Sequence, residues 1–266
     1  MTAFPDVPGV EVEHRFVEAN GLRFHVAEAG DGPPLVLLHG WPQHWWMWRG
    51  VLPQLSRTYR CILPDLRGLG WSDAPDGPYD KPQLARDVEA LLDALGLDRV
   101  RIMGHDWGAV ATQFLCVQAP ERVHKAISLN VAPLWDASYD PRQVLAVTHM
   151  PFLSAPFAER FVPGVARQLL RIAGISGPET EVYLERFEDP ARRRATVGYY
   201  RTFLTRELPA LFANRPPKPD VPVRFVGGKG DPIVRWAKNV ELVRGAGHFL
   251  PEDKPDAVIG HAMTFL

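Results

Sequence analysis

The residue with the clearest chemical potential is Asp106, in the run Gly104-His105-Asp106-Trp107-Gly108. This run follows an apolar segment typical of a buried strand and precedes a helical pattern, which is the arrangement of a nucleophile elbow. In such an elbow a tight turn exposes the central side chain, and the free N–H groups of the following helix lie beside it. A simple helix-capping aspartate is the alternative interpretation. We predict that Asp106 is a nucleophile.

A carboxylate nucleophile favours a particular class of substrate. With an ordinary pKa of about 3.9, it is ionised at neutral pH and attacks without help from a base. Attack on an ester or amide would produce a reactive anhydride, whereas attack on an electrophilic sp³ carbon produces an alkyl ester, a manageable covalent intermediate. That carbon must carry a leaving group, which is either a strained ring oxygen or a halide.

An acid and a base follow the nucleophile, each on a glycine-flanked loop after a strand. Asp231 ends the run Gly227-Gly228-Lys229-Gly230-Asp231, and His248 lies in Gly245-Ala246-Gly247-His248. The chain order nucleophile, acid, base is a known triad order. We expect Asp231 to orient His248, which then takes a proton from the water that attacks the ester.

The segment between the acid and the base is short. It leaves room for about two helical turns over residues 232–238. If the shortening displaced Asp231, the other position for the acid would follow the strand at 125–129, where Asn130 stands. An amide cannot carry the charge, so the expectation stays with Asp231.

Short apolar runs alternate with helical patterns, which predicts a mostly parallel sheet flanked by helices. Two runs at 15–19 and 22–27 meet at Asn20-Gly21, a strong hairpin signal, and a helix is expected over 82–95 because its leucines recur at helical spacing. The buried strands are expected at 35–38, 61–63, 100–103, 125–129 and 223–226.

The alternation stops between Pro133 and Pro219. That stretch has helical patterns at 165–172, 179–187 and 191–203, repeated prolines and no clear strand. We therefore predict a first core segment at 1–132, a helical cap at 133–219 and a second core segment at 220–266. The triple arginine at 192–194 is interpreted as a solvated helix face.

The composition of the 266-residue chain indicates one large globular unit, with 46% hydrophobic residues and a formal net charge of -1. No basic cluster suggests nucleic acid as a partner, and no run is apolar and long enough to cross a membrane. Cys61 and Cys116 lie in apolar runs and are expected to be buried thiols. Because the N-terminus has no signal-peptide pattern, we expect a cytoplasmic protein, either a monomer or a homodimer.

These motifs together resemble the epoxide hydrolase and haloalkane dehalogenase branch of the α/β-hydrolase fold family, and most of all the epoxide hydrolases. The resemblance rests on His39-Gly40-Trp41-Pro42 and on residues 65–73, 104–108 and 245–248. It covers the core and is weaker in the cap. It implies the α/β-hydrolase fold with an inserted helical cap, and conversion of a small apolar epoxide and water to a vicinal diol through an ester on Asp106, without cofactor or metal.

The resemblance also assigns the groups around the nucleophile. The backbone N–H groups of Trp41 and Trp107 would form the oxyanion hole. The side chains of both tryptophans, together with Phe249 beside the base, are expected to line the substrate pocket. His39 is interpreted as a structural histidine.

An opening epoxide needs proton donors for its oxygen, and relatives of this kind use two residues of the cap. One position corresponds to Tyr200 in Gly198-Tyr199-Tyr200-Arg201, so that Tyr199 becomes a packing residue. At the other position the expected tyrosine is replaced by His149, which can also donate a hydrogen bond. Tyr139 and Tyr183 remain alternatives to His149.

Two other functions stay open. A haloalkane or haloacid dehalogenase would use the same nucleophile, but such enzymes typically add a halide donor, and residues 139–234 contain no tryptophan. Fluoroacetate-type dehalogenases place an arginine after the nucleophile, where this chain has Trp107. A catalytically silent protein that binds a small ligand is compatible with the fold, although a binder has no need of nucleophile, acid and base together.

Overall fold

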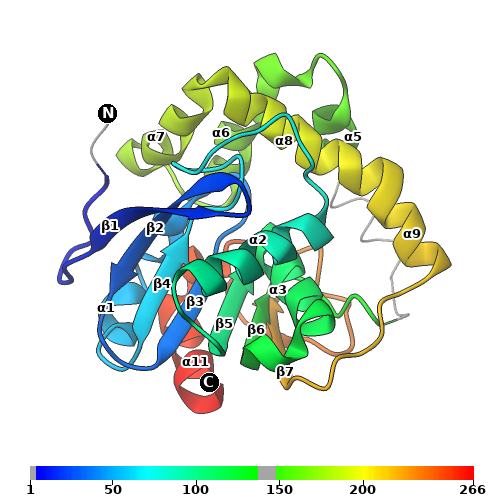
Figure 1. The fold of residues 1–266 in the computed structure, drawn as a ribbon. Helices are drawn as coiled ribbons and strands as arrows, with labels where there is room; N and C mark the ends of the chain where they lie inside the picture. The colour runs from blue at the N-terminus through cyan, green and yellow to red at the C-terminus, as the bar shows by residue number, and fades with distance from the viewer. Residues whose placement is uncertain (1–3, 137–147) are drawn as a thin grey trace.

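The computed structural model describes residues 4–136 and 148–266, and within them an eight-stranded sheet forms the centre of the molecule (Figure 1). The strands lie in the order β1-β2-β4-β3-β5-β6-β7-β8. Their bounds are β1 Glu13–Ala19, β2 Leu22–Ala29, β3 Pro34–Leu38, β4 Arg60–Pro64, β5 Val100–His105, β6 Val123–Leu129, β7 Val223–Gly228 and β8 Glu241–Val243.

The sheet is parallel except at one edge. β1 and β2 form the expected hairpin, in which Asn20 and Gly21 have φ values of 49° and 72°. β2 also runs antiparallel to β4, whereas each pairing from β4 and β3 through to β8 is parallel. All the strands predicted from apolar runs are present, and the carboxyl ends of β3, β5, β6 and β7 therefore meet along one edge of the sheet.

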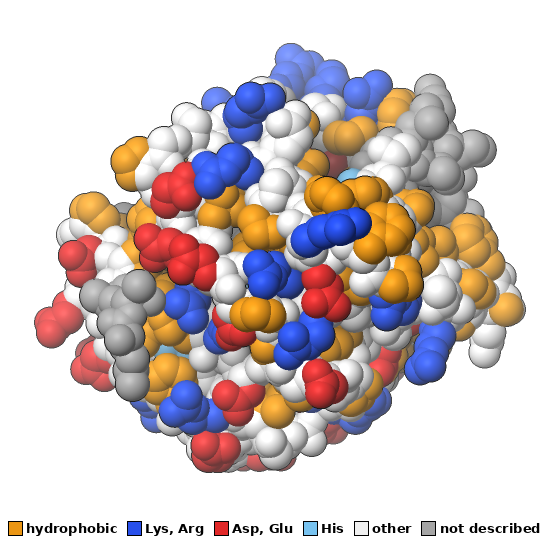
Figure 2. Space-filling model, turned by 90° about the horizontal axis from the view of Figure 1, so that it is seen from above, with side chains coloured by type: hydrophobic (Ala, Val, Ile, Leu, Met, Phe, Trp, Pro, Cys, Tyr) orange, Lys and Arg blue, Asp and Glu red, His pale blue; other side chains and the backbone are white. Residues whose placement is uncertain are grey.

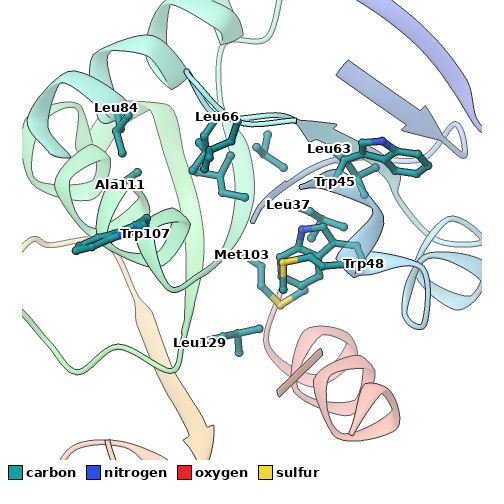
Figure 3. Packing of buried hydrophobic residues seen from close by; sticks show 14 of the residues in the cluster. Leu37, Trp45, Trp48, Leu63, Leu66, Leu84, Met103, Trp107, Ala111 and Leu129 are labelled. Carbon is teal, nitrogen blue, oxygen red and sulfur yellow. The ribbon is translucent and has the colours of Figure 1, made fainter. Parts of the chain in front are cut away.

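Helices cover both faces of the sheet, with α2 (Lys81–Ala94) and α3 (Trp107–Gln118) on one face and α1 (Leu52–Leu55) and α11 (Pro255–Phe265) on the other (Figure 1). The strand residues Leu37, Leu63, Met103 and Leu129 fill the space between these layers (Figure 3). Runs that are apolar on both faces bury both faces, which is typical of parallel strands. Cys61 and Cys116 are buried free thiols, as expected.

Between β6 and β7 the described residues form helices that lie over the carboxyl edge of the sheet (Figure 1). On the face of the molecule seen from above, basic and acidic side chains are interspersed with apolar ones (Figure 2). In the described part of the chain, no helix has the length and apolar character needed to span a membrane. The cap helices are α5 His149–Ser154, α6 Val162–Ile172, α7 Pro178–Leu184, α8 Pro190–Thr202 and α9 Leu208–Ala213.

The interpretation of the triple arginine as a solvated face is wrong for its first member. Arg192 is 9% exposed and donates hydrogen bonds to the backbone carbonyls of Gly70, at 2.6 Å, and Ser72, at 3.1 Å. It also pairs with Asp189, the N-cap residue of α8. A buried guanidinium requires this full set of acceptors, so Arg192 fixes the start of α8 to the core.

Candidate active site

Asp106 lies at the turn between β5 and α3, with φ 53° and ψ −121°. Such a strained backbone conformation is typical of functional positions and lifts the carboxylate above the edge of the sheet. The turn requires glycine at two close approaches. A Cβ on Gly104 would lie 2.3 Å from the carbonyl oxygen of Gly108, and a Cβ on Gly40 would lie 2.3 Å from the Cβ of Asp106.

The carboxylate of Asp106 is held by backbone donors. The N–H of Trp41 donates to Oδ1 at 2.9 Å, and the N–H of Trp107 is a second hydrogen-bond donor to the same side chain. Burial by itself raises the pKa of Asp106, but His248, His105 and the N–H of Trp107 outweigh burial, so the pKa lies below its ordinary value. Asp106 is therefore ionised, and the two N–H groups expected to form an oxyanion hole converge on it.

His248 bridges the two carboxylates. Its Nδ1 lies 3.0 Å from Oδ2 of Asp231, and its Nε2 lies 3.6 Å from Oδ2 of Asp106. Burial disfavours the charged imidazolium, but Asp231 and Asp106 outweigh it and raise the pKa of His248 to about 10. In this state the imidazolium is charged between two anions. The triad predicted from the glycine-flanked loops is thus assembled.

The acid stays in place although no helix follows it directly. Residues 232–236 make hydrogen-bonded turns and not the two helical turns for which the segment leaves room. Asp231 is fixed instead by Asn130, whose amide donates to Oδ2 at 2.7 Å, and by the N–H of Ile233, which donates to Oδ1 at 2.8 Å. Asn130, which stands at the alternative position for the acid, is the hydrogen-bond partner of the acid.

The triad opens into a cavity of about 460 Å³ beneath the cap. Trp41 and Phe249 line it, as expected. The expectation for Trp107 is wrong, because its ring is packed behind Tyr200 and beside Phe203, with ring centroids 5.6 and 5.1 Å apart. The described cap residues also give the cavity an apolar part of its lining, which consists of Met150, Leu169, Ile172 and Ala173.

Both candidate proton donors reach this cavity. Tyr200 and His149 line it together with Asp106, and their rings meet edge to face with centroids 5.7 Å apart. Burial and the nearby Asp106 hold the pKa of Tyr200 well above its ordinary value, so the phenol keeps its proton. Burial lowers the pKa of His149, so the neutral imidazole has one N–H to donate.

The other tyrosines have different partners. Tyr199 donates its hydroxyl to the carbonyl of Arg67 at 2.9 Å, which agrees with a packing role. Tyr183 donates to Glu252 at 2.6 Å and accepts from Arg49, so it is engaged between the cap and the core. Tyr139 lies outside the described residues.

Two buried histidines support the site. His39 accepts the N–H of Leu66 on Nε2 at 2.9 Å, which gives it the structural role expected. His105 donates from Nε2 to the carbonyl of His248 at 2.8 Å, and burial lowers its pKa to about 4. The sequence patterns assign no role to His105, although it directly precedes the nucleophile. No cluster of His, Cys, Asp or Glu within the described ranges could hold a metal ion.

The sequence and the structure are both similar to those of known proteins. A family model described as the alpha/beta hydrolase fold matches residues 33–255. A soluble epoxide hydrolase of Corynebacterium sp. (strain C12) is 33% identical, with 96% of this chain and 97% of the relative covered. The structure of epoxide hydrolase CorEH without ligand superposes with a TM-score of 0.84 at 33% identity, covering 96% of this chain and 98% of the other. The structure of epoxide hydrolase VrEH1 from Vigna radiata superposes with a TM-score of 0.80 at 27% identity, covering 96% of this chain and 97% of the other.

Proposed function

We propose that this chain, which belongs to the α/β-hydrolase fold family and is a hydrolase, acts as an epoxide hydrolase. One observation carries the proposal: a carboxylate nucleophile shares its cavity with two protonated donors, Tyr200 and His149. A carboxylate needs an sp³ carbon as its target, and a departing ring oxygen needs donors where a halide does not. The names of the relatives support the same activity.

The first chemical step opens the ring. An oxygen of Asp106 forms a bond to one epoxide carbon while the bond from that carbon to the ring oxygen breaks. Tyr200 transfers its proton to the developing alkoxide, which also accepts a hydrogen bond from His149, so the ring oxygen becomes a hydroxyl group and Tyr200 becomes a phenolate. Donors aimed at such a charge contribute about 2.7–4 kcal/mol each to transition-state stabilisation.

The second step depends on a change of charge. Alkylation converts Asp106 into a neutral ester and so removes one of the two anions that raise the pKa of His248. The imidazolium then gives up its proton, which restores the Tyr200 phenol by way of solvent. The neutral imidazole, still oriented by Asp231, becomes a base for water. The imidazole takes a proton from water, and the resulting hydroxide adds to the ester carbonyl, where the N–H groups of Trp41 and Trp107 hold the oxyanion. The acyl C–O bond then breaks, and the leaving alkoxide takes the proton of the new acid group, which releases the diol and restores the carboxylate of Asp106.

The substrate is expected to be small and largely apolar. The cavity of about 460 Å³ has an apolar wall from α5 and α6, in which Met150, Leu169 and Ile172 face the triad. Burial of apolar surface against such a wall stabilises a bound ligand by about 25 cal/mol per Å². An apolar epoxide would therefore bind with its ring at the triad and its substituent against α6.

Two variants test the mechanism. His248→Gln should undergo alkylation but not ester hydrolysis, so incubation with styrene oxide should add the mass of one substrate molecule to the intact protein. Asp106→Asn should add no mass and form no diol, because an amide is a feeble nucleophile. A panel of epoxides and haloalkanes, assayed for diol and halide, separates the two leaving groups; halide release without diol formation would overturn the proposal.

A further inference from the structure

Lys81 is a buried charge that the mechanism above does not use. It is the first residue of α2, and its side chain is completely buried. Moving an ammonium group out of water is costly unless it is paired and hydrogen-bonded. A smaller or apolar side chain would avoid that cost, so a buried lysine at this position indicates a functional role.

The ammonium group of Lys81 has two polar partners, both on the cap. Nζ donates to the carbonyl oxygen of Tyr199 at 2.8 Å and to Oε2 of Glu207 at 2.8 Å. The backbone N–H of Lys81 donates to Oε1 of the same glutamate at 2.7 Å. Glu207 ends the π-helical turn Phe203–Glu207 that follows α8. Such turns are rare overall, and many of those that occur lie at functional sites. This turn places Glu207 at the start of α2.

The same ammonium group lies 4.3 Å from the centroid of the Trp107 ring. A cation in this position is attracted by the negative face of the indole, and the attraction is stronger when water is excluded. The indole in turn meets Tyr200 edge to face, with centroids 5.6 Å apart. Trp107 is the first residue of α3. Neither Trp107 nor Lys81 lines the substrate cavity.

Both contacts of Lys81 converge on Tyr200. The accepting carbonyl belongs to the peptide bond between Tyr199 and Tyr200, and the indole packs against the phenol ring. We infer that Lys81 is a positioning residue for ring opening, which fixes the hydroxyl of Tyr200 at the place where the epoxide oxygen develops charge. This inference rests on the proposed function. Because Tyr200 acts in ring opening, the effect of Lys81 is confined to the alkylation step. A displacement of about 1 Å can slow a reaction about 100-fold.

The test is a double-mutant cycle between Lys81→Met and Tyr200→Phe. The rate constant for alkylation of Asp106 is measured by stopped-flow tryptophan fluorescence with styrene oxide, and the rate constant for ester hydrolysis is measured in the same traces. Lys81→Met should slow alkylation by about 10- to 100-fold and change ester hydrolysis by less than about 3-fold. In the Tyr200→Phe background, Lys81→Met should change alkylation by less than about 3-fold, since the hydroxyl that it positions is gone.

Lys125→Met is the matched control. Lys125 also donates to a backbone carbonyl, that of Phe265 at 2.7 Å, and lies 5.3 Å from the centroid of an aromatic ring. It contacts α11 rather than the cap, so both rate constants should stay within about 3-fold of the wild type. A loss in the Lys125 variant equal to that in the Lys81 variant would assign the effect to general destabilisation and overturn the inference.

The remaining outcomes are distinct. If Lys81→Met does not fold because Glu207 is left unpaired, the variant Lys81→Met/Glu207→Gln removes the buried pair together and enters the cycle in its place. If Lys81→Met slows alkylation equally in the wild-type and Tyr200→Phe backgrounds, the inference is overturned while the proposed epoxide reaction stands. Failure of the wild-type protein to open any epoxide would instead overturn the proposed function.

Discussion

Replacing Asp106 with asparagine tests the electrostatic part of the mechanism apart from turnover. Nε2 of His248 lies 3.6 Å from Oδ2 of Asp106. At an effective dielectric constant of about 20, two unit charges at this distance attract by about 4–5 kcal/mol, which corresponds to a change of about 3 in a pKa. The pKa of His248, about 10 in the intact site, should therefore fall to about 7 in the variant. Esterification of Asp106 removes the same charge during catalysis.

The measurement is an NMR titration of the His248 ring, assigned by comparison with His248→Gln. His261 is the internal control, because it lies beside Glu241 in another part of the molecule and its pKa should not change. Asp231→Asn should lower the pKa of His248 as well, since that carboxylate lies closer, at 3.0 Å. If His248 in Asp106→Asn still titrates within about one pH unit of its wild-type value, the charge of the nucleophile does not control the base and the reasoning is refuted.

Three further results are expected. Tyr200→Phe should slow alkylation by about 10- to 1000-fold and Tyr199→Phe by less than about 3-fold, because the Tyr199 hydroxyl is bonded to a core carbonyl; equal slowing in stopped-flow traces would contradict this assignment. Asn130→Ala should slow ester hydrolysis by about 10- to 100-fold through loss of a hydrogen bond to a buried charge, and an equal loss in alkylation, followed by mass spectrometry, would argue for a wider disturbance. The folded-state pKa of His248 lies above its ordinary value of 6.5. Its contribution to stability is therefore complete below about pH 6.5 and is lost as the pH rises through about 10. Urea unfolding should show this decline in the free energy of unfolding, by a few kcal/mol in the wild type and by less in Asp231→Asn.

The core and the triad could be predicted because their signals are local. Apolar runs mark the parallel strands, and the glycine-bounded loops after β5 and β7 mark Asp106 and Asp231 whatever lies elsewhere in the chain. Tyr200 and His149 were assigned only through a family resemblance, since no periodicity distinguishes Tyr200 from Tyr199. The structure separates the two tyrosines by the partners of their side chains.

The errors arose where the partner of a side chain is distant in sequence. Arg192 looked solvated because its neighbours are also arginines, but its acceptors lie on the loop at Gly70 and Ser72. Trp107 is directed away from the cavity because Lys81 and Phe203, from two other elements, contact its ring. Contacts of this kind depend on how the cap is seated on the core, which no local pattern records.

Helix α8 is fixed to the core at both ends, by Arg192 at its start and by the carbonyl of Tyr199 and the π-helical turn at its end. Tyr200 lies in the cap by its place in the chain, but the contacts of α8 hold it in a fixed position relative to the core. Helix α6, which supplies Leu169 and Ile172 to the apolar lining, makes neither of these two contacts. Substitutions of Leu169 and Ile172 in α6 can therefore alter which substituents are accepted while Tyr200 keeps its place. Specificity can then diverge during evolution with the same ring-opening chemistry.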